Sequence, residues 1–63
     1  MKALLSNTER DIYTILGALN RAMSRKEIWE EIEAAGTIDN QLNRLIQLNL
    51  IKKLGYNKYI INN

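Results

Sequence analysis

Residues 37–51 read TIDNQLNRLIQLNLI, and this stretch decides the fold. From Ile38 to Leu48 its isoleucines and leucines recur at intervals of three and four residues, which is the helical period. We therefore expect a helix over about 37–48 with one apolar face. Asn49 follows as a residue that tolerates the left-handed conformation at a helix end. The apolar run after it changes period and predicts a strand.

Two earlier segments carry a helix start signal. SNTE at 6–9 and SRKE at 24–27 both have the form Ser-x-x-Glu, in which each of the two side chains caps the free backbone amide of the other residue. Apolar residues follow at helical spacing, so helices are expected over about 7–20 and 25–34. Gly17 costs the first helix roughly 1 kcal/mol relative to Ala, so it marks either a close approach of another backbone or a tolerated defect.

The end of the chain predicts a β-hairpin. Residues 50–54 and 58–61 are rich in β-branched, aromatic and other apolar side chains, and Gly-Tyr-Asn at 55–57 separates them. An isolated hairpin is marginal in water, so it must rest on the helices, with a third short strand expected over 21–23. The expected fold class is mostly α with a small β-hairpin, and Tyr59 is expected in the core.

The composition limits what such a domain does. Its 63 residues include no Cys and no His, so the ligands of zinc and haem sites and the commonest catalytic side chains are missing. We therefore expect neither an enzyme nor a cofactor, and infer no small-molecule ligand. An apolar share of 46% is typical of a globular protein. No apolar run approaches the roughly 20 residues that span a bilayer, so one intracellular domain over 1–63 is expected.

Charge is unevenly distributed, although the net charge is only +2. Residues 24–39 contain two cations and five carboxylates, whereas residues 40–63 contain four cations and no carboxylate. A purely basic segment favours a phosphate backbone or an acidic partner. Solvated cations that keep the protein soluble explain the same pattern.

Three stretches resemble the winged helix-turn-helix regulators of the penicillinase-repressor and multiple-antibiotic-resistance-regulator families. LSNTERDIYTIL at 5–16 is similar to their opening helix, MSRKEI at 23–28 to the start of the turn motif, and TIDNQLNRLIQLNLI at 37–51 to the recognition helix and the strand after it. The resemblance implies a winged helix-turn-helix domain that binds double-stranded DNA as a transcriptional regulator by occupying its site, in the cytoplasm with the nucleoid. Winged helices also serve protein contacts without DNA, and this alternative stays open.

In such a domain the exposed side of the helix over 37–48 enters the major groove. Four polar residues lie on that side at helical spacing, and they are the expected base-reading residues: Asn40, Asn43, Arg44 and Gln47. Asn and Gln pair with adenine, and Arg pairs with guanine. A merely solvated helix face is the alternative, although Glu and Lys are the more usual residues there.

A second set of residues is expected to hold phosphates: Arg25, Lys26, Thr37, Gln41, Lys52, Lys53 and Lys58. The lysines of the hairpin equally suit the protection of an exposed strand edge against aggregation. Asp39 and the acidic segment before it oppose DNA binding unless they face away from the duplex.

Surplus apolar residues suggest a homodimer, which would add buried area to a thin core. The expected interface residues are Leu4, Leu5, Trp29 and Ile46. Packing of Ile46 under the hairpin is the alternative for that residue. Trp29 stands where the resembled families usually have Ala, and Gly36 lies later than their usual turn glycine. An indole there either separates the two helices or points aside, as a core residue or as an interface anchor.

Overall fold

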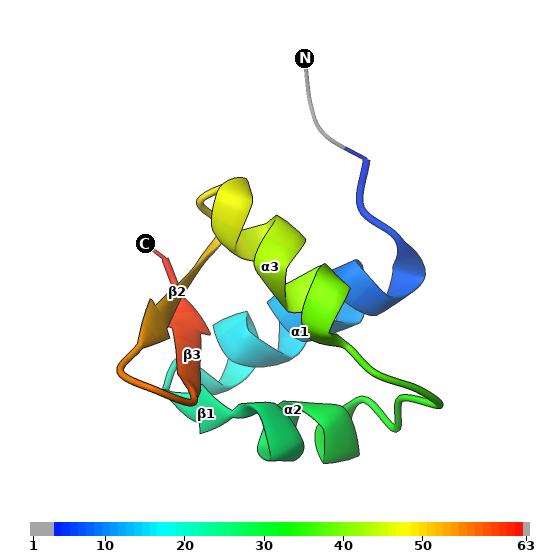
Figure 1. Cartoon of the computed structure of the whole chain (residues 1–63), viewed down its shortest axis with the longest axis horizontal. Helices are drawn as coiled ribbons and strands as arrows, with labels where there is room; N and C mark the ends of the chain where they lie inside the picture. The colour runs from blue at the N-terminus through cyan, green and yellow to red at the C-terminus, as the bar shows by residue number, and fades with distance from the viewer. Residues whose placement is uncertain (1–3, 63) are drawn as a thin grey trace.

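The computed structural model describes residues 4–62. Its elements follow one another as α1 (Asn7–Leu19), β1 (Met23–Ser24), α2 (Arg25–Glu31), α3 (Asp39–Gln47), β2 (Ile51–Leu54) and β3 (Lys58–Ile61). Three helices and a three-stranded antiparallel sheet give a mixed α/β arrangement, less dominated by helix than the sequence predicts (Figure 1). None of the helices in this part of the chain has the length and apolar character that crossing a bilayer requires.

The start of α1 is fixed by a complete capping box. The Glu9 amide donates to the Ser6 hydroxyl at 3.2 Å, and the Ser6 amide donates back to the Glu9 carboxylate at 2.8 Å. The helix ends at Asn20, whose φ of 49° lies in the left-handed region. The expected boundaries of about 7–20 are thus confirmed to within one residue.

The helix α2 has the same capping box, between Ser24 and Glu27, but it is shorter than predicted. It ends at Glu31 because Glu33 adopts a left-handed φ of 53°. The amides of Glu33 and Ala34 then donate to carbonyls of the last turn, at 3.2 Å each, in the pattern of a Schellman motif. The prediction that this helix continues to residue 34 is therefore wrong.

The helix α3 begins two residues later and ends one residue earlier than predicted. Ile38 has non-helical torsion angles, and the Thr37 hydroxyl accepts from the Asp39 amide at 3.3 Å. At the other end Asn49 has a φ of 61°, and its amide donates to the Ile46 carbonyl at 3.0 Å. Asn49 therefore ends the helix in the left-handed conformation, as the sequence predicts.

The sheet has the strand order β1-β3-β2. The hairpin of β2 and β3 pairs Ile51 with Ile61 and Leu54 with Lys58, and its turn is made possible by Gly55, which has a φ of 59°. The expected third strand is confirmed, although it is formed by Met23–Ser24 rather than by 21–23, and it pairs with β3.

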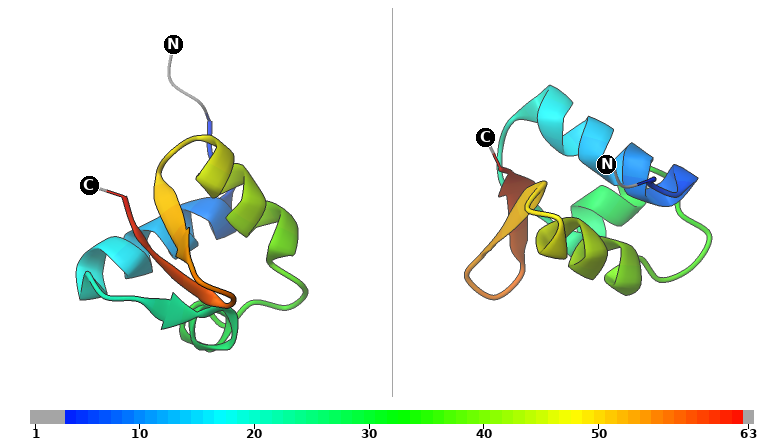
Figure 2. Two further views of the ribbon diagram at one scale, coloured as in Figure 1. Left: turned by 60° about the vertical axis from the view of Figure 1, so that its left-hand side comes forward. Right: turned by 90° about the horizontal axis from the view of Figure 1, so that it is seen from above.

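A single core holds these elements together. Its buried residues come from every helix and strand: Ile12, Leu16, Met23, Ile28, Ile38, Leu42, Leu45, Ile51 and Tyr59. Tyr59 is thus confirmed as a core residue. The helix α1 packs against both other helices and against β3, and the hairpin projects beside α3 (Figure 2). The outward side of α3 and the hairpin therefore border one surface.

Candidate nucleic-acid interface

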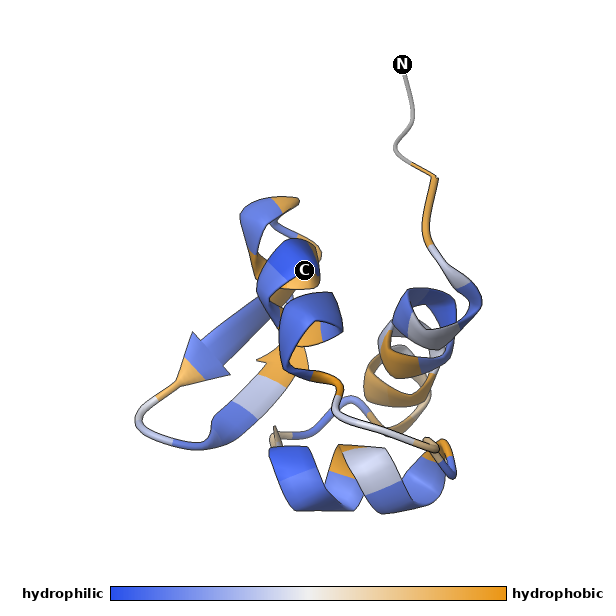
Figure 3. Cartoon of the chain, turned by 45° about the vertical axis from the view of Figure 1, so that its right-hand side comes forward, coloured by the Kyte–Doolittle hydropathy of each residue, from blue (hydrophilic) through white to orange (hydrophobic). Residues whose placement is uncertain are grey.

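The outward side of α3 carries three exposed carboxamides, Asn40, Asn43 and Gln47. Leu42 and Leu45 on the opposite side are fully buried, which fixes the rotation of the helix about its axis. Hydrophilic and hydrophobic residues accordingly alternate along its ribbon in Figure 3. We call these three residues the carboxamide face. None of them forms a hydrogen bond to another side chain within residues 4–62, so their donors and acceptors face solvent.

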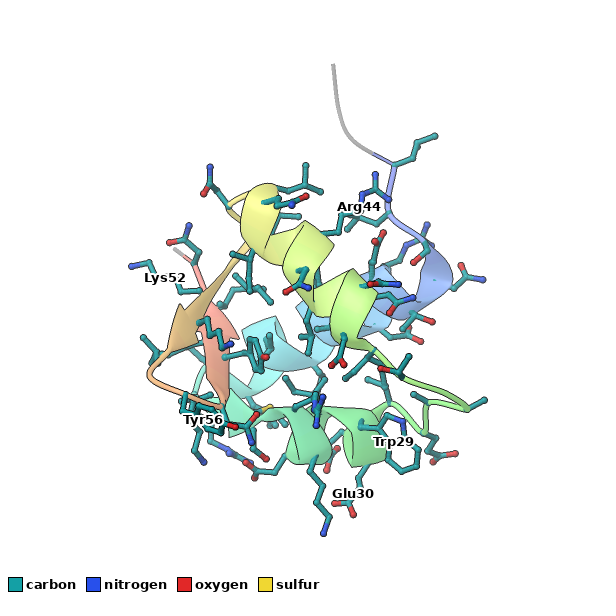
Figure 4. The ribbon with its side chains drawn as sticks, in the orientation of Figure 1. Trp29, Glu30, Arg44, Lys52 and Tyr56 are labelled. Carbon is teal, nitrogen blue, oxygen red and sulfur yellow. The ribbon has the colours of Figure 1, made fainter. Side chains whose placement is uncertain are left out.

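Arg44, the fourth expected base-reading residue, differs from these three because its guanidinium is bound to another part of the chain. Its Nη1 lies 3.1 Å and 3.4 Å from the two carboxylate oxygens of Glu9, and its Nη2 donates to the Leu4 carbonyl at 3.0 Å. In Figure 4 the side chain turns toward the segment that precedes α1. The Glu9 side chain is only 5% exposed and that of Arg44 is 46% exposed, so the carboxylate is shielded from water while the guanidinium is only partly shielded. Arg44 therefore joins α3 to the start of α1.

Gln41 is half-buried, and its Oε1 is buried without a hydrogen-bond partner among the described residues. A phosphate accepts hydrogen bonds, so the expected contact would be made by the Nε2 of this side chain and not by its Oε1. The phosphate contact of Gln41 therefore stays a prediction. Thr37 is exposed, and its hydroxyl is held by the Asp39 amide at the start of α3.

Arg25 and Asp39 form an ion pair that the sequence did not reveal. The Nη1 of Arg25 lies 2.8 Å from the Oδ1 of Asp39, and both side chains are about half exposed. The hydrogen bond from Arg25 lowers the pKa of the Asp39 carboxyl, and the same bond raises the pKa of Arg25. Asp39 was expected to oppose an anion; here its charge is compensated by the first residue of α2.

A polar hollow of about 380 Å³ separates the carboxamide face from the hairpin. It is lined by Arg25, Asp39, Asn43, Lys53, Tyr56, Asn57 and Tyr59. The structure thus brings together one residue of the carboxamide face, one cation of α2 and one cation of β2. Tyr56 is 93% exposed and stands at the tip of the hairpin, where Figure 4 shows it next to the start of α2.

Of the four expected phosphate-binding lysines, only Lys53 lines this hollow. Lys52 and Lys53 are neighbours in a strand, so their side chains point to opposite faces of the sheet, and only Lys53 lines the hollow. Figure 4 shows Lys52 on the outer side of the hairpin. The Nζ of Lys58, in β3, lies 3.9 Å from the Oε1 of Glu27, in α2. Lys26 lines a second, more apolar hollow with Trp29 and Thr37.

The four expected interface residues do not form one surface. Leu5 and Ile46 are partly buried and pack against the core. Leu4 is 87% exposed and lies before α1. Trp29 points aside: its indole Nε1 donates to the Gly36 carbonyl at 2.8 Å, so it fastens the loop between α2 and α3. Trp29 and Gly36, the two positions at which the sequence departs from the resembled families, are thus joined by this hydrogen bond.

Comparisons of this chain with protein-family models, with curated proteins and with solved structures found no match.

Proposed function

We propose that this protein binds double-stranded DNA as a small winged helix-turn-helix regulator, with α3 in the major groove and the hairpin of β2 and β3 as the wing. The observation that carries the proposal is the carboxamide face, which is exposed and turned away from the core. Carboxamides form paired hydrogen bonds with base edges. A helix face that only contacts water would more often carry better helix formers than Asn.

The arrangement around that face supports the proposal. The order of helices and strands, with β1 pairing β3 and the hairpin following α3, is the order expected of a winged helix. The hollow beside Asn43 offers Arg25 and Lys53 to a phosphate strand. Glu30 is exposed and lies on the side of α2 that faces away from α3 in Figure 4, so its charge does not confront a duplex bound there.

The protein would regulate transcription by occupying its DNA site. A domain of this size has little interior volume in which to bind a small-molecule effector. With a net charge of only +2, a single copy would bind modestly. Two copies on a two-fold symmetric site would increase the affinity and require half-sites about one helical turn apart. The mass of the complex in solution separates one copy from two.

The proposal is tested by selecting duplexes from a random pool and titrating salt against the selected one. The logarithm of affinity should fall linearly with the logarithm of salt concentration, with a slope of about −0.9 for each phosphate contact. A protein-interaction module would show no duplex selection, and its contacts through Trp29 would respond weakly to salt. Absence of any duplex binding in low salt would refute DNA binding.

Two lysine variants test the geometry. Lys53→Ala should weaken binding to all duplexes and reduce the salt slope by about 1, because Lys53 lines the hollow. Lys52→Ala removes the same charge from the other face of the sheet, so it should have the smaller effect. Equal losses would place the phosphate strand outside the hollow.

A further inference from the structure

The two arginines nearest the carboxamide face are both engaged with carboxylates of the protein itself. Arg25 is paired with Asp39 at 2.8 Å, and Arg44 contacts both oxygens of Glu9. An exposed helix side with three carboxamides and no free guanidinium does not recognise all bases equally well. We propose that the carboxamide face binds sites with adenine at the contacted positions, and that Glu9 maintains this preference by holding Arg44 away from the bases. The inference rests on the proposed DNA binding and specifies its target.

The preference follows from the hydrogen-bonding groups of the bases. Adenine offers an acceptor, N7, beside a donor, the N6 amino group, and a carboxamide matches this pair with one donor and one acceptor. Guanine offers two acceptors, N7 and O6, which suit the two parallel donors of a guanidinium. When a carboxamide pairs with guanine in the same way, its oxygen lies against a second acceptor, the guanine O6 or N7, and the two repel each other. Asn40, Asn43 and Gln47 therefore favour adenine.

The position of Arg44 is difficult to change. Its departure would leave the Glu9 carboxylate, only 5% exposed, without its counter-ion, and an unpaired buried charge is strongly unfavourable. Glu9 cannot follow, because its Oε1 also accepts from the Ser6 amide at 2.8 Å at the start of α1. Arg44 would in addition lose the Leu4 carbonyl. A guanine contact would first have to offset these losses, so Glu9 acts as a positioning residue.

The first experiment compares two duplexes that differ only at the central base pairs, A·T in one and G·C in the other, in direct competition. We expect at least about tenfold preference for the A·T duplex. Replacing the contacted adenines by 7-deazaadenine removes N7 from the major groove while base pairing is kept, and should abolish the preference. A preference that survives this replacement would arise from groove shape and would overturn the inference.

The second experiment releases Arg44. Glu9→Gln removes the charge that holds the guanidinium, and should lower the ratio of A·T to G·C binding several-fold by improving binding to G·C. Arg44→Ala should leave this ratio unchanged, and Asn43→Ala should lower it by weakening binding to A·T. An unchanged ratio in folded Glu9→Gln, or a reduced ratio in Arg44→Ala, would overturn the role of Glu9. Circular dichroism verifies that each variant is folded. If Glu9→Gln does not fold, the ratio measured for Arg44→Ala is the test of the inference.

The outcomes separate this inference from the proposed function. If the protein binds neither duplex in low salt, DNA binding itself is refuted. If it binds both duplexes equally, or prefers G·C, DNA binding stands and the adenine preference is refuted.

Discussion

The guanidinium of Arg25 and the carboxylate of Asp39 connect the first turns of α2 and α3, with 2.8 Å between Nη1 and Oδ1. Both groups line the polar hollow beside Asn43. In an uncomplexed protein the pair neutralises a cation that would otherwise face a phosphate strand. The pair therefore limits how strongly this side of the molecule attracts anions.

Replacing Asp39 by Asn should tighten binding to every duplex in low salt and steepen the salt slope by about 1, because Arg25 becomes available to a phosphate. Base preference should not change. The measurement is fluorescence anisotropy over a salt series. Asp11→Asn is the matched control, because it removes the same charge from the groove between α1 and α2. Equal gains in the two variants would show that net charge alone is responsible.

The indole of Trp29 should contribute to stability through its hydrogen bond to Gly36 at 2.8 Å. Trp29→Phe keeps an aromatic ring but removes the donor, and should lower the free energy of unfolding by about 1 kcal/mol. Urea denaturation followed by circular dichroism measures this loss. Tyr56→Phe also removes one polar group from an aromatic ring, but at a side chain that is 93% exposed, and should leave the midpoint in place.

Gly17 and Gly55 should respond oppositely to replacement by Ala. A Cβ at Gly17 would meet only Ile61 Cδ1 at 3.9 Å, an ordinary contact, so the helix gains about 1 kcal/mol from the better helix former. For a domain of this size the Tm should rise by about 4–8 °C.

Gly55 has a φ of 59°, which costs a residue with a side chain about 1–2 kcal/mol, so Gly55→Ala should lower the Tm. Gly55→Asn should lower it less, since Asn tolerates this region. A fall in Tm on Gly17→Ala would instead indicate that the Ile61 side chain needs the space.

Stability should decrease in acid partly through Glu27. A hydrogen bond from the Ser24 amide lowers the pKa of this carboxyl, and the charges of Arg21 and Lys58 act in the same direction. Because the pKa is lower in the folded than in the unfolded state, the stabilisation is complete above the ordinary glutamate pKa of about 4.3 and is lost as the pH falls through the lowered value.

The urea midpoint of the wild type should therefore fall more between pH 6 and pH 3 than that of Glu27→Gln. Glu31→Gln, an exposed residue of the same helix, serves as the control and should follow the wild type. Parallel curves for all three proteins would contradict the assignment to Glu27.

The sequence predicts the elements of this fold well, because their signals are local. Both capping boxes involve residues three apart, and Asn49 ends α3 with a conformation that its own side chain favours. The end of α2 was predicted wrongly because no local sequence signal marks it. Glu33 is left-handed although Glu has no preference for that region, so only the packing of the following loop determines the boundary.

The sequence predicts the exposure of the carboxamide face, but it does not predict the ion pair that Arg44 forms beside that face. The helical period alone turns Asn40, Asn43 and Gln47 away from Leu42 and Leu45. Arg44 lies at the edge of that side, and its direction depends on where α1 places Glu9, a contact between residues 35 positions apart. In the sequence Glu9 is recognisable only as a capping residue. The capping role and the ion pair use the same carboxylate, and only the first leaves a local pattern.

The strand order has a consequence for the synthesis of the chain. The strand β3 follows β1 and β2 in the chain, yet it lies between them and takes part in both strand pairings of the sheet. Until residues 58–61 have been made, β1 and β2 lack the strand with which they pair. The domain therefore completes its fold only after translation has passed its final strand, and a message truncated shortly before that point encodes a product that lacks Tyr59 in its core.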